Sequence, residues 1–325
     1  MTSFLGTIER DGADLPALFI GEQYQLINTI VPEVSLATTT EVIGRWSELV
    51  DQLNNAIDDS HDWPILDPSE LGRPINPSTV LCAGSNYRAH NAEKKSSPTS
   101  GKEPEFFIKT GDCVIGPNDE IIHDPLLTKK LDCETELAIV IGKPGRHIPI
   151  NNALDHVFGY TVANDVTARD RQVRTNDQGF TWYELGRGKA FDTSLPLGPW
   201  ISLPGTIADP QDLILSTQIN DELRQRSSTA DMIWTCAELI HFFSINFTLK
   251  PGMVILTGTP AGTAWSNDST LGGKWSSDDP DLIPATRYCE PGDVIESSIS
   301  KIGSIQSSIA SYKQTRTRNY GTASS

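Results

Sequence analysis

The stretch that decides the fold reads Leu131-Asp132-Cys133-Glu134-Thr135-Glu136-Leu137-Ala138-Ile139-Val140-Ile141-Gly142. Residues 137–141 form an apolar run that ends at a glycine, which predicts a buried strand. Because side chains at i and i+2 of a strand lie on one face, Glu134 and Glu136 should point the same way and Thr135 the other way. Two neighbouring carboxylates repel each other unless a cation or a shared proton lies between them, and Mg²⁺ prefers such oxygen ligands. The alternative for this pair alone is a strand end whose carboxylates lie in water.

A third acid follows the next predicted strand. Residues 156–163 form a second apolar run, and Asp165 comes shortly after its end. Side chains at strand exits commonly project into functional sites. Carboxylates from Glu134, Glu136 and Asp165 would form an open octahedral site for a hard divalent cation, with positions left for water and a substrate. A turn residue or a helix N-cap is the alternative role for Asp165.

Several further motifs follow one another along the chain. They are residues 86–93 (NYRAHNAE), 106–109 (FFIK), 115–117 (IGP), 132–137 (DCETEL), 164–170 (NDVTARD), 188–192 (GKAFD), 197–200 (LGPW), 257–260 (TGTP) and 291–294 (PGDV). Together they resemble the fumarylacetoacetate hydrolase family over roughly residues 78–310. The resemblance implies an α+β fold, in which a mixed, strongly bent sheet rolls into a barrel-like core with few helices.

Composition limits the class of protein. The chain has 325 residues, ample for a sizeable core, and no apolar stretch long enough for a membrane helix. Five scattered cysteines without a CxxC pair indicate neither a zinc site nor a disulfide framework. The N-terminus lacks a secretory signal pattern, so we expect a cytoplasmic protein. A net charge of −16 argues against nucleic acid or an anionic membrane as a partner.

The chain divides near the proline-rich stretch 62–77. Residues 1–75 should form a small N-terminal α+β module, with a hairpin about Gly21-Glu22 and a helix over residues 40–57. Residues 76–313 should form the catalytic domain of the family, and residues 314–325 a polar, flexible tail. A helix is also expected after Asp231, and His241 on that helix is interpreted as a core or rim histidine.

His90 and Glu93 are spaced i, i+3, which places them on one face of a helical turn. A carboxylate beside an imidazole orients the ring and raises its basicity, which suits proton abstraction from water. A surface pair on a helix is the alternative for an isolated HxxE. The resemblance implies that His90 and Glu93 are the water-activating dyad of the family.

The same motifs contain polar residues that the resemblance places around the substrate. Lys189 is implied to stabilise negative charge beside the metal, and Arg169 and Gln172 to contact the substrate. Lys109 and Thr259 are further substrate-binding candidates, although Thr259 can equally be a turn residue. The three residues after Lys109 depart from the Pro-Ser-Ser of many family members, which leaves the local pocket and the substrate open.

The implied function is a divalent-metal-dependent hydrolase, with Mg²⁺ or else Mn²⁺ or Ca²⁺, acting in catabolism. It would cleave a carbon–carbon bond in a small dioxo acid of the acylpyruvate or fumarylacetoacetate type through a metal-bound enolate. Decarboxylation of oxaloacetate-like acids and isomerisation of hydroxymuconates are alternatives on the same scaffold, because they share the metal and the enolate. A family member that binds a ligand without catalysis is an alternative of a different class. The expected assembly is a homodimer.

Residues 265–288 are the main departure from the family, which usually joins its TGTP and PGD motifs by a short loop. The insertion is interpreted either as a surface excursion or as a substrate lid. Its many Gly, Ser and Asp residues give few apolar anchors, so we expect it to be mobile when the site is empty. Trp265 and Trp275 are exceptions that could close over an apolar substrate tail.

Overall fold

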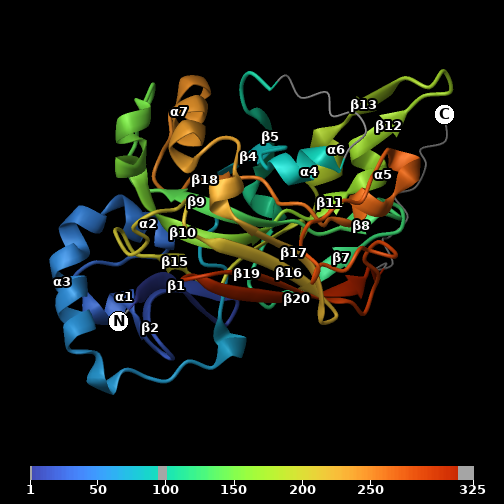
Figure 1. Cartoon of the computed structure of the whole chain (residues 1–325). Coiled ribbons are helices and arrows are strands. Elements are labelled where there is room, and N and C mark those ends of the chain that lie inside the picture. The colour runs from blue at the N-terminus through green and yellow to red at the C-terminus, as the bar shows by residue number, and fades with distance from the viewer. Residues whose placement is uncertain (1, 94–100, 314–325) are drawn as a thin grey trace, which may run out of the picture.

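The computed structural model describes residues 2–93 and 101–313 of the chain. A small sheet with strand order β15-β1-β2-β3 lies beside a larger curved β-structure (Figure 1). Its strands are β1 (Ser3–Arg10), β2 (Ala13–Ile20), β3 (Gln23–Leu26) and β15 (Ile201–Ser202). The predicted hairpin is confirmed, because β2 and β3 pair antiparallel across Gly21-Glu22.

The helical part of the N-terminal region is interrupted. A short helix, α1 (Ile27–Ile30), follows β3. The single helix predicted over residues 40–57 is two helices, α2 (Thr39–Gly44) and α3 (Trp46–Asp58). The break lies at Arg45, whose φ of −111° and ψ of 12° depart from helical geometry. The apolar spacing predicted the helical type correctly but carried no signal for this break.

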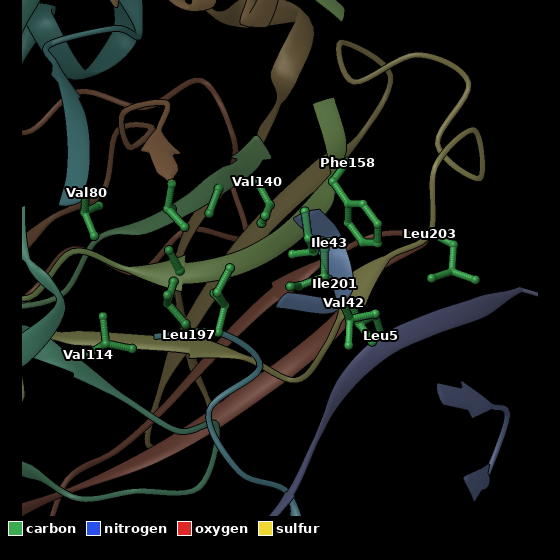
Figure 2. Packing of buried hydrophobic residues seen from close by; sticks show 14 of the residues in the cluster. Leu5, Val42, Ile43, Val80, Val114, Val140, Phe158, Leu197, Ile201 and Leu203 are labelled. Carbon is green, nitrogen blue, oxygen red and sulfur yellow. The ribbon is translucent and has the colours of Figure 1, made fainter. Parts of the chain in front are cut away.

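The N-terminal region shares its core with the rest of the chain. Leu5 and Val42 belong to the same buried cluster as Val140, Phe158 and Leu197, which come from the larger sheet (Figure 2). In addition, β1 pairs with β15, which lies far along the chain. The N-terminal region is therefore fastened to the larger domain by both backbone and apolar contacts, and the boundary near residue 75 stays a proposal.

The central sheet of the larger domain has the order β5-β4-β18-β9-β10-β14-β6. It is mixed, because β4 and β18 pair parallel, as do β14 and β6, whereas β9 pairs antiparallel with both β10 and β18. Its strands are β4 (Thr79–Gly84), β5 (Glu105–Thr110), β6 (Val114–Ile115), β9 (Thr135–Ile141), β10 (Val157–Asn164), β14 (Leu195–Gly198) and β18 (Val254–Leu256). Every residue of β9 is buried, as the apolar run predicts for a strand covered on both faces.

A second sheet, with order β17-β16-β19-β20-β7, packs against β9 and β10 and completes the curved core (Figure 1). Its strands are β7 (Ile121–His123), β16 (Ile214–Ile219), β17 (Glu222–Ser228), β19 (Val294–Ile299) and β20 (Gly303–Ser311). Thr135 Oγ1 lies 2.6 Å from Thr217 Oγ1 on β16 and donates to Ser297 Oγ on β19 over 2.8 Å. Thr135 therefore faces the second sheet, opposite to its two glutamate neighbours, as strand alternation predicts. This mixed, curled core with few helices confirms the predicted α+β fold.

The helix expected after Asp231 is α7 (Cys236–Asn246). A capping box between Thr235 and Glu238 starts it. Its residues Leu239, Ile240 and Phe243 are buried. His241 Nδ1 lies 2.7 Å from the carbonyl of Ile148, a contact within the packing of this helix.

Short elements surround the open edge of the core. They are α4 (Arg88–Ala92), β8 (Leu131–Asp132), β11 (Thr167–Ala168), α5 (Arg169–Gln172), β12 (Val173–Thr175), β13 (Thr181–Tyr183) and α6 (Leu185–Lys189). β8 pairs with β11, and β12 with β13, in two-stranded sheets. Within the described ranges, no helix is both long and apolar enough to cross a membrane.

The insertion over residues 265–288 contains two short 3₁₀ segments, Ala264–Asn267 and Ser269–Leu271. Polar contacts fasten it to the domain: Lys130 Nζ lies 2.5 Å from Asp268 Oδ2, and Arg226 Nη2 lies 2.9 Å from Asp279 Oδ1. The mobility predicted for this segment was inferred from its few apolar residues alone. These ion pairs are additional contacts that would restrict its motion. The predicted tail, residues 314–325, lies outside the described residues.

Candidate active site

Three carboxylates converge where β9 begins and β10 ends. Glu134, Glu136 and Asp165 each offer an oxygen, and these oxygens lie within 4.8 Å of one another. All three residues are buried. The antiparallel register that pairs Thr135 with Asn164 brings the two strand ends together. The Asp165 N–H also donates to the Glu134 carbonyl over 2.8 Å, which fixes the spacing of the two acids.

Buried cations surround this carboxylate triad. Lys189 Nζ lies 2.5 Å from Glu134 Oε2 and 2.6 Å from Asp165 Oδ2. Arg169 Nη2 lies 2.5 Å from Glu134 Oε1, and Arg169 Nε lies 2.8 Å from Asp132 Oδ2. Two positive charges thus hold Glu134 and Asp165, whereas Glu136 accepts a hydrogen bond from the N–H of Gly258 over 2.7 Å.

The three acids differ in how their charges are compensated. Burial opposes ionisation of Glu134, but the charges of Arg169 and Lys189 outweigh it and hold the pKa of Glu134 well below its usual range. Burial, together with the charges of Asp165 and Glu134, raises the pKa of Glu136 well above its usual range. Negative charge on Glu136 is therefore the least compensated in the triad.

The donor set fits a divalent cation. Asp165 Oδ1 is buried, and within the described ranges its close contact is the ion pair with Lys109 Nζ at 2.9 Å, which lacks the angles of a hydrogen bond. A divalent cation between the three carboxylates would compensate the negative charge of Glu136. It would therefore lower the pKa of Glu136 again. A set made of carboxylate oxygens suits hard ions such as Mg²⁺ or Mn²⁺. Glu134, Glu136 and Asp165 are thus the residues that could hold the metal.

His90 and Glu93 lie at the end of the short helix α4. His90 Nδ1 lies 3.1 Å from Glu93 Oε2, and both side chains are buried. Glu93 Oε1 accepts a hydrogen bond from the N–H of Gly262 over 2.8 Å. The Glu93 carbonyl accepts another from the N–H of Lys274, in the insertion, over 2.7 Å. Glu93 is therefore held by two segments of the chain: Gly262 holds its carboxylate, and Lys274 holds its backbone carbonyl.

A cavity of about 120 Å³ lies between the dyad and the triad. Phe107, Leu185, Tyr183 and Trp265 supply its apolar and aromatic wall. The cavity is lined by Ala83, Gly84, Ser85, His90, Glu105, Phe107, Glu134, Glu136, Asp165, Gln172, Tyr183, Leu185, Lys189, Gly258, Thr259 and Trp265. His90 and the three acids therefore line one cavity, in which a small molecule can contact all of them.

The predicted substrate-binding residues fall into two groups. Gln172 and Thr259 line the cavity. The Thr259 hydroxyl donates to the Thr135 carbonyl over 3.0 Å, so its side chain also fixes the turn. Arg169 and Lys109 are fully buried behind the cavity wall, where they contact carboxylates. This placement favours a role for Arg169 and Lys109 in positioning other residues, in place of direct substrate contact.

Sequence reasoning missed part of the wall. Tyr183, from the β12–β13 hairpin, packs on Trp265 with ring centroids 6.1 Å apart. The Trp265 ring also covers the Arg169 guanidinium at 5.2 Å. Trp265 was identifiable as a large aromatic residue at the start of the insertion. Tyr183 and Glu105 carried no such signal, because neither belongs to a motif.

Comparisons with known proteins identify the family of this chain. The model of the fumarylacetoacetate hydrolase C-terminal domain matches residues 79–310. A fumarylacetoacetate hydrolase domain-containing protein 2 homolog of Dictyostelium discoideum is 33% identical over 273 residues, which cover 82% of this chain and 81% of that protein. An oxaloacetate tautomerase of Bacillus subtilis is 38% identical over 246 residues, which cover 75% of this chain and 74% of that protein.

A solved structure extends the likeness to nearly the whole chain. The fumarylacetoacetate hydrolase of the psychrophile Exiguobacterium antarcticum superposes with a TM-score of 0.71 and 31% sequence identity. The superposition covers 95% of this chain and all of that chain, so it includes the N-terminal region as well as the curved core.

Proposed function

Because the chain belongs to the fumarylacetoacetate hydrolase family, we propose that it is a divalent-metal-dependent enzyme that transfers protons on a small 2-oxo acid. The observation that carries this proposal is the cavity in which His90, oriented by Glu93, faces the buried carboxylate triad. When bound at the triad, a divalent cation would act as a Lewis acid and stabilise negative charge that develops on the substrate oxygens.

His90 is the proposed general base. Glu93 lies against Nδ1, so proton exchange with a bound molecule would use Nε2. The carboxylate stabilises the imidazolium that forms when the ring accepts a proton. The hydrogen bond from Gly262 to Glu93 keeps this carboxylate in place, and the ring stays oriented toward the cavity.

Lys189 is the proposed electrostatic partner on the opposite side. Burial would lower the pKa of Lys189, but the charges of Asp165 and Glu134 outweigh it and raise the pKa, so the ammonium stays protonated. Its position in the cavity wall places a fixed positive charge beside the substrate. Such a preorganised charge stabilises an enolate more than it stabilises the neutral ketone.

Interconversion of the keto and enol forms of an oxaloacetate-like acid is the first candidate reaction. His90 would take a proton from the carbon next to the keto group, and reprotonation on the oxygen would give the enol. The likeness to the Bacillus subtilis oxaloacetate tautomerase, over three quarters of both chains, supports this candidate.

Hydrolysis of a carbon–carbon bond in an acylpyruvate-type or fumarylacetoacetate-type acid is the second candidate, and it is the reaction implied by the sequence motifs. His90 would take a proton from water, and the resulting hydroxide would attack a carbonyl. The electron pair of the broken carbon–carbon bond would pass to an enolate, which is protonated on release. The likeness to the Exiguobacterium antarcticum hydrolase supports this candidate.

One experiment separates the two reactions. Purified protein is incubated with oxaloacetate, acylpyruvates or fumarylpyruvate in the presence of Mg²⁺, Mn²⁺ or Ca²⁺. Loss of enol absorbance without a change in carbon skeleton identifies tautomerisation, whereas release of two acids identifies hydrolysis and release of carbon dioxide identifies decarboxylation. The His90→Ala and Glu136→Ala proteins are the controls. Inactivity of the wild type on every substrate with every ion would contradict the proposal.

We also propose Mg²⁺ as the physiological ion, a homodimer as the assembly and the cytoplasm as the compartment. All five cysteines are buried and unpaired, as suits a reducing compartment. Light scattering on the purified protein, and fractionation of the source cells, test the assembly and the compartment.

A further inference from the structure

A second cavity of about 110 Å³ lies behind the catalytic cavity. Residues close together in the sequence line the two cavities: Glu134 and Thr259 line the catalytic cavity, whereas Cys133 and Thr263 line the second one. The opposite wall comes from β16, β17 and residues 285–288 of the insertion. We name this space the Arg224 cavity.

The Arg224 cavity contains buried donors without partners. The Arg224 side chain is only 9% exposed, and its Nη2 lies 2.5 Å from Glu222 Oε2. Arg224 Nε and Nη1, and Thr263 Oγ1, are buried and have no hydrogen-bond partner within residues 2–93 and 101–313. Buried polar groups are nearly always hydrogen-bonded, because leaving a charged donor unpaired is costly. These atoms therefore offer buried donors to a ligand that accepts hydrogen bonds.

The acids that line the Arg224 cavity already have cations of their own. Asp132 Oδ2 lies 2.8 Å from Arg169 Nε, and Asp293 Oδ2 lies 2.6 Å from Arg287 Nη1. Glu222, the partner of Arg224 Nη2, is half exposed at the rim and can turn into water. An incoming anion thus meets Arg224 without an unpaired carboxylate beside it.

We propose that the Arg224 cavity binds a small oxyanion, either a short carboxylate or a phosphate, through the Arg224 guanidinium and the Thr263 hydroxyl. A guanidinium offers its donors in a planar fork that matches two oxygens of one carboxylate or phosphate. The volume of about 110 Å³ admits a ligand of roughly ten non-hydrogen atoms. Arg224 and Thr263 lie outside the catalytic cavity, so this site is separate from the carboxylate triad.

The position of this site couples it to the catalytic residues. Thr263 lies directly after Gly262, whose N–H holds Glu93, and directly before Ala264, whose N–H donates to Asp132 Oδ1 over 3.0 Å. A side chain at Gly262 would meet the Arg224 carbonyl at 1.9 Å, so the two backbones are in close contact. An anion that draws Arg224 and Thr263 together therefore shifts the segment that orients the dyad. This regulatory part rests on the proposed function, whereas the binding site does not.

Binding is tested by calorimetry on the full chain with inorganic phosphate and, separately, malonate. A chelator is present throughout, so that no divalent cation can hold the anion in the catalytic cavity. The expected result is millimolar binding of at least one anion, weakened roughly tenfold or more by Arg224→Leu. Arg146→Leu, which removes an exposed arginine near the end of α7, is the matched control for charge. The anion that binds more tightly identifies the source of the oxyanion.

The site is overturned if neither anion binds the wild type, or if Arg224→Leu leaves the affinity unchanged. If Arg224→Leu does not fold, Thr263→Val and Arg224→Lys replace it, and each should weaken binding. A crystal soaked in phosphate that shows only water in the cavity also overturns the site. Coupling is tested afterwards with the substrate found above: the bound anion should change kcat or KM of the wild type and not of Thr263→Val. An anion that binds without changing either constant overturns the regulatory part alone.

Discussion

Lys109 Nζ lies 2.9 Å from Asp165 Oδ1, and neither side chain is exposed to solvent. Lys109 Nζ also donates to the carbonyl of Ser194 over 2.7 Å. These contacts place the ammonium behind one of the three metal-binding candidates, outside the cavity wall. Lys109 therefore orients Asp165 and compensates its charge, although the sequence motif favoured a contact with the substrate.

Replacing Lys109 by methionine should destabilise the protein by about 3–5 kcal/mol, because it removes one of the two cations that contact the buried carboxylate of Asp165. Affinity for Mn²⁺ should change as well, since the orientation of Asp165 depends on Lys109. Urea unfolding and calorimetry measure the two effects. Lys143→Met, at an exposed lysine, is the matched control. Unchanged stability combined with a raised KM would instead support direct substrate binding by Lys109.

Replacing Glu136 by alanine should abolish divalent-cation binding and activity together, while the fold survives. Glu136 supplies one of the three clustered oxygens, and its negative charge is the least compensated among them. Its removal also relieves repulsion in the triad, so the variant should unfold at the same or a higher urea concentration. Calorimetry with Mn²⁺ decides the assignment. Glu290→Ala, at an exposed glutamate, is the control, and wild-type affinity in Glu136→Ala would rule out the site.

The strand pattern predicted the carboxylate triad, because alternation and strand-end position depend only on local sequence. Glu134, Glu136 and Asp165 needed no knowledge of distant contacts to be singled out. The partners of Arg169 and Lys109 could not be predicted in this way. Tertiary packing decides which carboxylates these two side chains contact. The sequence therefore placed two cations near the site but did not show whether they point toward the substrate or toward the acids.

The same limit explains the insertion and the Arg224 cavity. Asp268 and Asp279 are unremarkable in sequence, and only the fold brings Lys130 and Arg226 to them. Arg224 lies on β17 in an ordinary polar strand sequence, and its burial follows from the segments that pack over it. The sequence could not predict that these polar residues are buried or paired, because burial of a polar group depends on the tertiary structure.

Replacing His90 by alanine should lower kcat by roughly 10²–10⁴ on the true substrate, as expected for loss of a general base. Affinity for Mn²⁺ should stay nearly the same, since His90 is not proposed as a ligand. Glu93→Gln should give a smaller loss, because the ring keeps a hydrogen-bond partner but loses the charge that stabilises the imidazolium. Steady-state kinetics with matched protein concentrations measure both. A near wild-type rate in His90→Ala would falsify the assignment.

Acid should loosen the insertion through Asp268. Burial tends to raise the pKa of Asp268, but hydrogen bonds from Lys130, Thr270 and Tyr288 outweigh it and lower the pKa from 3.8 to about 2. A folded-state pKa below the unfolded value contributes stability above about pH 4, and this contribution is lost as the pH falls toward 2. The Asp268→Asn protein should therefore be less stable than the wild type at neutral pH, with the difference shrinking in acid.

Melting temperatures of wild type and Asp268→Asn, recorded from neutral pH downward, test this prediction. Asp278→Asn removes an exposed carboxylate from the same segment and serves as the control. A difference in melting temperature that stays constant down to the acid limit would show that Asp268 does not contribute through its charge.

Trp265 should set the size of the acyl group that the enzyme accepts. Its ring is only 2% exposed and forms the cavity wall between Tyr183 and the guanidinium of Arg169. Trp265→Ala should cost about 3–5 kcal/mol of stability through the space it leaves, and it should lower KM for longer substrates relative to short ones. Trp265→Phe keeps an aromatic wall and should retain the wild-type preference.

Affinity for Mn²⁺ should be unchanged in both variants, which separates a change in the cavity wall from damage to the carboxylate triad. Kinetics on acids of increasing chain length measure the preference, and identical KM ratios in wild type and Trp265→Ala would show that this ring covers Arg169 without selecting the substrate.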